Sequence, residues 1–333
     1  MTRFLTMASF IALLAACDNQ QPLDFGLGGD DTPVDLPDDD GPLLDDDGEE
    51  VPIAGNGIPE AIAGTLDGVS YDPNAGTLEV RIRSLDSTPE SAVYERTPAL
   101  DVPGYIAYTQ QEDPLDRFFV SYVQTSEDEA TVGALVMDGG QFQTFIAGTN
   151  YAQAGGYTVP LASQPDNGLV AYTGYYVGIL NFPELDTSLL LTPGTGVSPD
   201  LRPRQPARVQ GEVLINADFV NMSVNGGIAE RTIVSPTFLD ADLPAELLNV
   251  GLEPSDIAAD GTFFGNAKVL AEDIGAYGGT FGGEDASGVA IGVHLDGDFI
   301  KEIDDEEEYG VIVLTKCGLP GDGPYCPDVQ PDF

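Results

Sequence analysis

The stretch GTFFGNAKVLAEDIGAYGGTFGGEDASGVAIGVHL, from Gly261 to Leu295, decides the fold of this chain. Toward its end apolar and small residues alternate, and the apolar ones, which share one face of an expected strand, are Val289, Ile291, Val293 and Leu295. Glycines inside strands mark bends or bulges, and when they recur across a sheet they permit the tight curvature of a small barrel. The stretch therefore predicts antiparallel strands that curl into a closed barrel.

Neighbouring segments extend this pattern. Val209–Phe219 alternates between an apolar and a polar face, which is typical of an antiparallel strand with one wet side, and Glu308–Thr315 is a further apolar strand. We expect about eight strands between residues 168 and 316, the number that closes a small barrel with a filled interior. A short helix is expected near Pro244 to Asn249.

Residues 57 to about 160 read as a second β-rich region, with about six short strands broken by Gly, Asn, Asp and Pro. The segments expected to be extended include 76–83, 117–123, 132–137 and 141–146. Asp138-Gly139-Gly140 is expected to join the last two as a hairpin.

Glycines and phenylalanines recur at regular places in the C-terminal half. They are Gly261, Phe263 and Gly265, then Gly278, Gly279 and Phe281, then Ala286, Gly288 and Gly292, with Ala217-Asp218-Phe219 and Asn225-Gly226 upstream. This pattern resembles the barrel of transferrin-binding protein B and related bacterial surface lipoproteins, over roughly residues 170–316. Larger members of that family have two lobes, each a handle domain plus a barrel, and this chain has room for one lobe. Transferrin binding does not follow from the resemblance, because a fold does not fix a function.

These patterns together predict an all-β chain, with a β-rich, handle-like N-terminal region followed by a C-terminal eight-stranded antiparallel β-barrel. The expected parts are a lipoprotein signal peptide (1–16), an acidic disordered tether (17–56), a handle-like domain (57–165), the barrel (166–316) and a disulfide-closed tail (317–333).

The charge of the chain is strongly negative, with 12 Lys and Arg against 56 Asp and Glu and a formal net charge of −44. A nucleic acid would be repelled, so no nucleic-acid partner is expected. Twelve of the acids lie between Asp24 and Glu50 among Pro and Gly, which predicts a self-repelling disordered linker. The acidic runs do not meet the EF-hand pattern, so no metal-ligating residues are assigned, and diffuse binding of Ca²⁺ stays open.

Residues 1–17, MTRFLTMASFIALLAAC, have one charge and a short apolar stretch that is too short to span a bilayer. Leu14-Ala15-Ala16-Cys17 resembles the lipobox of bacterial lipoproteins, in which the cut falls before the cysteine and the cysteine is lipidated. The alternative is an ordinary secretory signal with a chance cysteine. The resemblance implies lipidation at Cys17, a membrane partner through that anchor, and a cell-envelope location at the outer membrane, on its surface or periplasmic face.

Two cysteines remain, Cys317 and Cys326, separated by eight residues. An exported chain meets an oxidising compartment, which favours a disulfide between them that pins the tail after the last strand. A redox or metal-binding pair is the alternative, and the absence of a nearby histidine in the sequence makes zinc coordination poor.

One basic cluster stands out, in LRPRQPAR. It consists of Arg202, Arg204 and Arg208, which either pair with nearby carboxylates or bind an anionic group of a partner, since the guanidinium matches carboxylate and phosphate geometry. Tyrosines in the preceding strand are candidate binding anchors or, alternatively, core residues: Tyr172, Tyr175 and Tyr176.

Enzymatic chemistry has little support. His294 is the only histidine and no Gly-x-Ser-x-Gly elbow occurs, so we expect neither an enzyme nor a cofactor. The leading hypothesis is a lipid-anchored cell-envelope binding protein that captures a protein or nutrient ligand with loops on a β-barrel scaffold. The alternative is a structural envelope lipoprotein with no exchangeable ligand.

Overall fold

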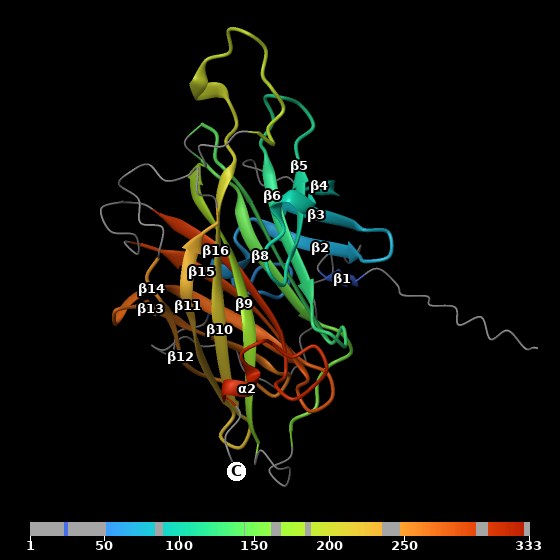
Figure 1. Cartoon of the computed structure of the whole chain (residues 1–333), viewed down its shortest axis with the longest axis vertical. Coiled ribbons are helices and arrows are strands. Elements are labelled where there is room, and N and C mark those ends of the chain that lie inside the picture. The colour runs from blue at the N-terminus through green and yellow to red at the C-terminus, as the bar shows by residue number, and fades with distance from the viewer. Residues whose placement is uncertain are drawn as a thin grey trace, which may run out of the picture.

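The computed structural model describes residues 23–25, 51–83, 89–142, 144–160, 168–183, 188–234, 247–297 and 306–329. Within these ranges the regular secondary structure is almost entirely strand, arranged as one open sheet and one closed barrel (Figure 1). The predicted all-β class and the eight-stranded antiparallel barrel are confirmed.

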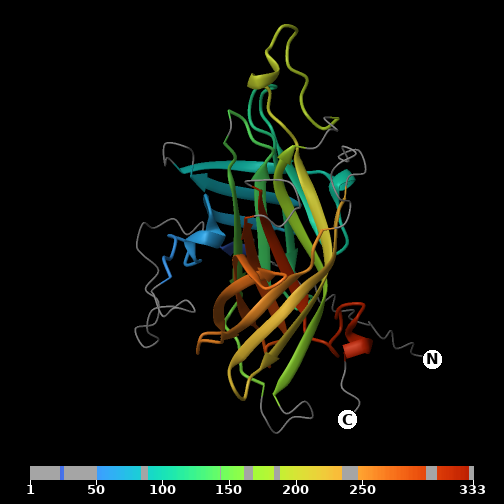
Figure 2. The same ribbon diagram turned by 90° about the vertical axis from the view of Figure 1, so that its left-hand side faces the viewer.

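The first sheet takes its strands in sequence order, each antiparallel to the next. They are β1 (Leu23–Phe25), β2 (Leu66–Asp72), β3 (Thr77–Arg83), β4 (Pro89–Arg96), β5 (Ile106–Gln110), β6 (Phe119–Thr125), β7 (Thr131–Asp138) and β8 (Ala147–Gln153). The helical turns α1 (Glu60–Ala63) and η1 (Pro98–Leu100) connect them. Figures 1 and 2 show that β3 and β4 run across the direction of β6–β8, so the sheet is strongly twisted.

The barrel contains the eight strands β9 (Leu169–Pro183), β10 (Pro206–Asp218), β11 (Ser223–Ile233), β12 (Val250–Asp256), β13 (Thr262–Val269), β14 (Glu272–Gly282), β15 (Gly288–Asp296) and β16 (Glu307–Thr315). The last strand pairs with β9 and closes the ring, with Gly310 opposite Gly178. Two short helices accompany it, η2 (Pro199–Leu201) between β9 and β10 and α2 (Cys326–Val329) at the end.

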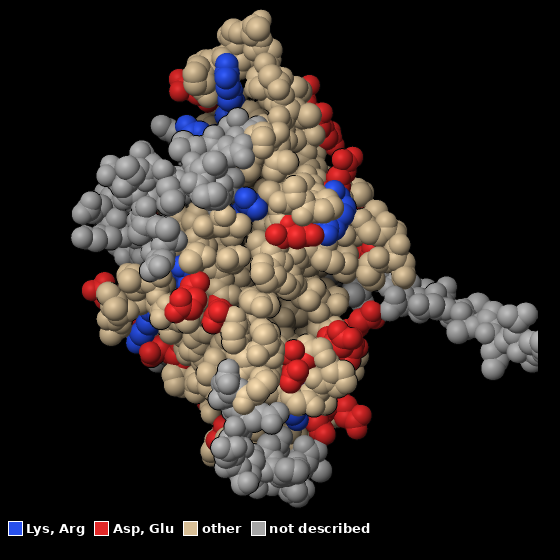
Figure 3. Space-filling model, in the orientation of Figure 1, with Lys and Arg blue, Asp and Glu red and all other residues tan. Residues whose placement is uncertain are grey.

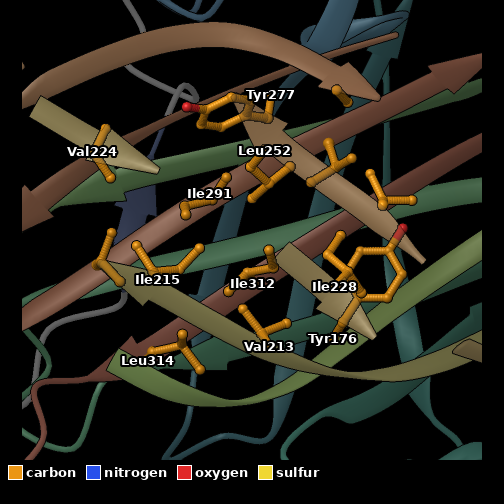
Figure 4. Packing of buried hydrophobic residues seen from close by; sticks show 14 of the residues in the cluster. Tyr176, Val213, Ile215, Val224, Ile228, Leu252, Tyr277, Ile291, Ile312 and Leu314 are labelled. Atoms are coloured by element: carbon orange, nitrogen blue, oxygen red, sulfur yellow. The ribbon is translucent and has the colours of Figure 1, made fainter. Parts of the chain in front are cut away.

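Alternating side chains fill the barrel interior. Figure 4 shows aliphatic residues from several strands, among them Val213, Ile215 and Leu252, converging on one another. At one end an aromatic group forms, in which the Phe281 ring lies 5.1 Å from Phe263 and 5.0 Å from Phe219. A side chain at position 279 would collide with the Phe263 ring at 2.6 Å, so the glycine of the Gly-Gly-x-Phe motif makes room for the phenylalanine of the preceding strand.

The two sheets share a second core where the first sheet packs on the outer face of β14–β16. Glycine permits this close approach, because a Cβ at Gly133 would lie 2.7 Å from the Val311 side chain, and one at Gly292 would lie 2.5 Å from Ile62. Val311 and its neighbours in β16 are buried on both faces of the barrel wall, which explains the continuous apolar run in the sequence.

One predicted strand is wrong. Residues 141, 142 and 144–146 lie outside the named strands, and β8 begins only at Ala147. The Arg117 guanidinium donates hydrogen bonds to the carbonyl oxygens of Thr144 and Gln141 and pairs with the Asp138 carboxylate. The backbones of Gln141 and Thr144 also bond to each other in an isolated bridge, so these two residues do not extend the pairing of β7 with β8.

Two other expectations change. Of the helix expected near Pro244 to Asn249, residues 247–249 are not helical and the rest lies outside the described residues.

Within the predicted tether, β1 pairs with β2, opposite residues 69–71, and Ala54 is buried beside a bridge between Ile53 and Pro59. Parts of the 17–56 segment are therefore ordered against the first sheet, while residues 26–50 lie outside the described residues.

Among the described residues, no helix has the length and apolarity needed to cross a membrane.

Candidate functional site

Three connecting segments meet at one end of the molecule, and we call this surface the loop end: residues 111–118, 139–142 with 144–146, and 188–205. The Gln141 side chain joins them, because its Nε2 donates to the carbonyl oxygens of Leu115 (2.9 Å) and Leu201 (2.8 Å). The backbone N–H of Leu191 donates to Gln111 Oε1 at 2.8 Å. The segments therefore form one connected surface, at the top of Figures 1 and 2.

A groove of about 730 Å³ crosses the loop end. Its lining comes from the β7–β8 loop, from η2 and the residues after it, and from the ends of β9 and β16. The backbone of Gly139 lies against that of Arg204, so close that a Cβ would fall 2.1 Å from the Arg204 carbonyl oxygen. Only glycine permits this approach, which fixes one wall of the groove against the other.

Large apolar side chains are exposed on the loop end, and two of them, Phe142 and Leu201, line this groove. They are 42–60% exposed and comprise Leu115, Phe142, Leu191 and Leu201. Phe142 is the most exposed of the four and has a positive φ of 57°, an unusual backbone conformation for an aromatic residue. Gathered apolar side chains on a folded surface mark interaction sites, whereas single ones do not.

Two of the three predicted arginines lie on the groove. Arg202 and Arg204 both line it and are exposed, and Arg202 Nη2 donates to the Val197 carbonyl oxygen at 3.0 Å. Figure 3 shows basic side chains over this end of the molecule. Arg208 is different, because it lies on β10 with 8% of its surface exposed and does not line the groove. The structure thus brings together Arg202 and Arg204, and separates Arg208 from them.

Tyr176 is a core residue and is not an exposed binding anchor. It is fully buried, and its hydroxyl donates to Glu308 Oε1 at 2.6 Å. Glu308 Oε2 in turn accepts from Arg231 Nη2 at 2.6 Å, in an ion pair whose side chains are both fully buried. Burial and the adjacent Glu308 carboxylate raise the pKa of Tyr176 well above its usual value. Gly310 provides the space, because a Cβ there would lie 2.1 Å from the Tyr176 hydroxyl.

Arg231 is a buried charge that the sequence did not reveal. Simple alternation from the inward-facing Ile228 would point Arg231 to the solvent. The strand is irregular between these residues, with Glu230 at φ 50° and a register shift against β10, and this turns Arg231 inward. The guanidinium then reaches from β11 to β16 across the interior and also donates to the Leu248 carbonyl oxygen.

The other two candidate tyrosines, Tyr172 and Tyr175, do not line the groove of the loop end. Tyr172 is buried and donates to the Ala286 carbonyl oxygen. Tyr175 is half-buried, and its ring lies 6.1 Å from that of Tyr325 in the C-terminal tail. It lines a separate small pocket of about 210 Å³.

The predicted disulfide between Cys317 and Cys326 is confirmed. The backbone N–H of Cys317 donates to the Ala171 carbonyl oxygen at 3.0 Å, which holds the tail on β9. Tyr325, one residue before the second cysteine, donates to Glu212 on β10. The tail is therefore fastened across two barrel strands.

His294 contacts two neighbouring side chains of β16, Tyr309 and Glu307. Its ring stacks on Tyr309 with centroids 4.4 Å apart, and Nε2 is 3.2 Å from a Glu307 carboxylate oxygen. Within the described ranges, no group of three or more His, Cys, Asp or Glu side chains is arranged to hold a metal ion.

The fold and the loop end define a two-part β protein, in which a curled open sheet packs on a closed barrel and presents a groove among fixed loops. No protein-family model and no curated protein matches the chain.

Solved structures of transferrin-binding protein B resemble it. Intact Ap-TbpB, with its N and C lobes, is 12% identical, is matched over 76% of this chain and 55% of its own, and has a TM-score of 0.32. A double mutant of the vaccine antigen TbpB from Haemophilus parasuis Hp5 is 12% identical over 75% of this chain and 53% of its own, with a TM-score of 0.32. Isotype 1 TbpB from serogroup B Neisseria meningitidis is 11% identical over 75% and 51%, with a TM-score of 0.33. The chain spans about half the length of these proteins.

Proposed function

We propose that this chain is a lipid-anchored cell-envelope binding protein that holds a protein ligand at the loop end. One observation supports this above the others: two exposed apolar side chains, Phe142 and Leu201, and two arginines line a single groove on loops that hydrogen bonds join to one another. Apolar anchors beside arginine are the side chains that dominate binding energy at protein interfaces. A ligand surface with an apolar patch beside carboxylates fits this composition.

The location belongs to the same proposal. A lipobox-like Leu14-Ala15-Ala16-Cys17 after a short apolar stretch supports lipidation at Cys17 and attachment to the outer membrane. Mass spectrometry of the mature N-terminus tests it, because a lipidated chain begins at Cys17 with acyl chains. An unmodified N-terminus cut elsewhere would leave the binding proposal intact and remove the anchor.

Site-specific crosslinking in intact cells tests the loop end. A photo-reactive amino acid replaces Phe142 in one strain and Leu270, 83% exposed at the β13–β14 turn, in the matched control. We expect a discrete protein adduct from position 142 that is absent from position 270. Arg202→Glu with Arg204→Glu should abolish that adduct without changing the thermal midpoint of the purified protein.

Two outcomes contradict the proposal. No adduct from position 142 in cells that supply the ligand would remove the loop end as the binding surface. Equal adducts from both positions would indicate that envelope components surround the folded part of the chain on all sides. That result would favour the alternative, a structural envelope lipoprotein with no exchangeable ligand.

A further inference from the structure

The first sheet has an opening between β4 and β5. Residues 89–94 of β4 pair with β3, from Pro89 opposite Arg83 to Tyr94 opposite Leu78, and only Glu95 and Arg96 pair with β5. Within the described residues, 89–94 therefore have a partner strand on one side only. The cause is the twist seen in Figure 2, because β4 runs across the direction of β5 and β6, and β4 and β5 pair over only two residue pairs.

A cleft of about 660 Å³ fills the opening. Its floor belongs to the core of the first sheet and includes Val80, Ala92, Tyr94, Phe119 and Ile146. The opposite wall comes from the loop after β5 and from Phe142. An apolar floor beside an unpaired strand edge is what an added β-strand needs, since backbone hydrogen bonds give affinity and alternate side chains enter the floor.

The rim of this cleft is acidic. Glu90, Glu112 and Asp116 line it, all three are exposed, and none takes part in an ion pair within the described residues. The cleft's arginine, Arg117, already pairs with the buried Asp138. The local field therefore favours a ligand with positive charge.

We propose that the open edge of β4 binds an extended peptide segment of a partner protein, with apolar side chains for the floor and Lys or Arg side chains for the rim. The segment adds to the first sheet as a strand beside residues 89–94. The inference goes beyond the proposed function, because it concerns a different hollow and a partner of the opposite charge. The cleft shares Gln141 and Phe142 with the groove of the loop end, but its other lining residues differ, and Arg202 and Arg204 do not line it.

Fluorescence anisotropy tests the proposal with a labelled peptide of alternating Val and Lys, and with an alternating Val and Glu peptide for comparison. Ala92→Phe fills the floor, whereas Val93→Phe places the same side chain on the opposite face of the same strand, where Val93 is 59% exposed. We expect the Val–Lys peptide to bind about tenfold more weakly to the Ala92→Phe protein, because the aromatic ring occupies the floor, and with unchanged affinity to the Val93→Phe protein.

Two further measurements distinguish a loss of peptide binding from misfolding of the Ala92→Phe protein. Glu112→Lys with Asp116→Lys changes only exposed rim side chains and should weaken the Val–Lys peptide several-fold, by about threefold for each charge. Hydrogen exchange of the intact protein should show slower exchange of backbone amides in β4 when the peptide is bound. Equal binding of the Val–Glu peptide, no binding of the Val–Lys peptide at about 1 mM, or protection elsewhere with β4 unchanged would each overturn the proposal.

Discussion

In the barrel, β16 pairs with β9 and each strand has two hydrogen-bonded neighbours, whereas the first sheet ends at β1 and opens between β4 and β5. Closure removes strand edges and leaves an interior that side chains must fill. The open sheet instead leaves a strand edge, a cleft and, with the β9–β10 loop, the groove of the loop end. In this comparison the barrel is the closed scaffold, and both proposed binding surfaces lie on and beside the open sheet.

The largest expected effect concerns the aromatic group of the barrel. Phe281→Ala should lower the free energy of unfolding by about 4 kcal/mol, because the buried ring contacts Phe263 and Phe219 and a cavity would remain. Phe142→Ala, on the exposed loop end, should change it by no more than about 0.5 kcal/mol. Denaturant unfolding of both variants measures the difference, and similar losses would contradict a division into scaffold and binding surface.

The buried ion pair comes next. Arg231→Met leaves the Glu308 carboxylate in the barrel interior with the Tyr176 hydroxyl as its remaining partner, which should cost about 3 kcal/mol of stability. Lys268→Met removes the half-buried partner of Glu253 and Asp273 at the surface of the same barrel and should change the thermal midpoint little. If the two variants melt together, the Arg231–Glu308 pair is not the stabilising contact that its burial indicates.

The disulfide should contribute less. Cys317→Ser with Cys326→Ser opens a loop of about ten residues, and the chain-entropy model gives a loss of about 2–3 kcal/mol. Because the tail is fastened to β9 and β10, hydrogen exchange should speed up in those strands and stay unchanged in β2–β4. Equal acceleration in both sheets would show that the two parts unfold as one unit.

The smallest expected effect concerns Asp128, whose hydrogen bond with Ser287 joins the first sheet to the barrel. Burial raises the pKa of Asp128, but hydrogen bonds from Ser287, Ser126 and the Ala130 backbone outweigh it, and the net pKa is lowered. The stabilisation is present above the unfolded pKa and is lost as the pH falls through the folded one. Asp128→Asn should therefore cost about 1 kcal/mol at pH 7 and less at pH 3, as thermal melts at both pH values would show. A loss that grows toward pH 3 would contradict this sign.

Local pattern predicted the barrel because its strands alternate regularly and its glycines accompany phenylalanines that pack on them, as at Gly279 and Phe263. The disulfide followed from compartment and spacing. Arg202 and Arg204 were found because positive charge is rare in this chain, yet Arg208 in the same cluster is buried and does not line the groove.

Other features depend on contacts far apart in sequence. Arg231 turns inward through an irregularity at Glu230 that no alternation reveals. The loop before β8 is held by Arg117, more than twenty residues earlier. The cleft arises from the twist between β4 and β5, which a linear pattern does not contain.

The pairing of β1 with β2 defines two chain lengths between Cys17, where the lipid is proposed, and the folded part of the chain. Leu23 lies six residues after Cys17, so a lipid at Cys17 and the docked strand can be no more than about 20 Å apart along the chain. β1 contributes only three residue pairs, and the next described residue after it is residue 51, so the chain from Cys17 to that point has a contour length of at most about 110 Å. With the proposed lipid at Cys17, β1 is the contact of the first sheet nearest to the anchor along the chain, and a pull on the anchor would reach its three residue pairs before those of β2 with β3.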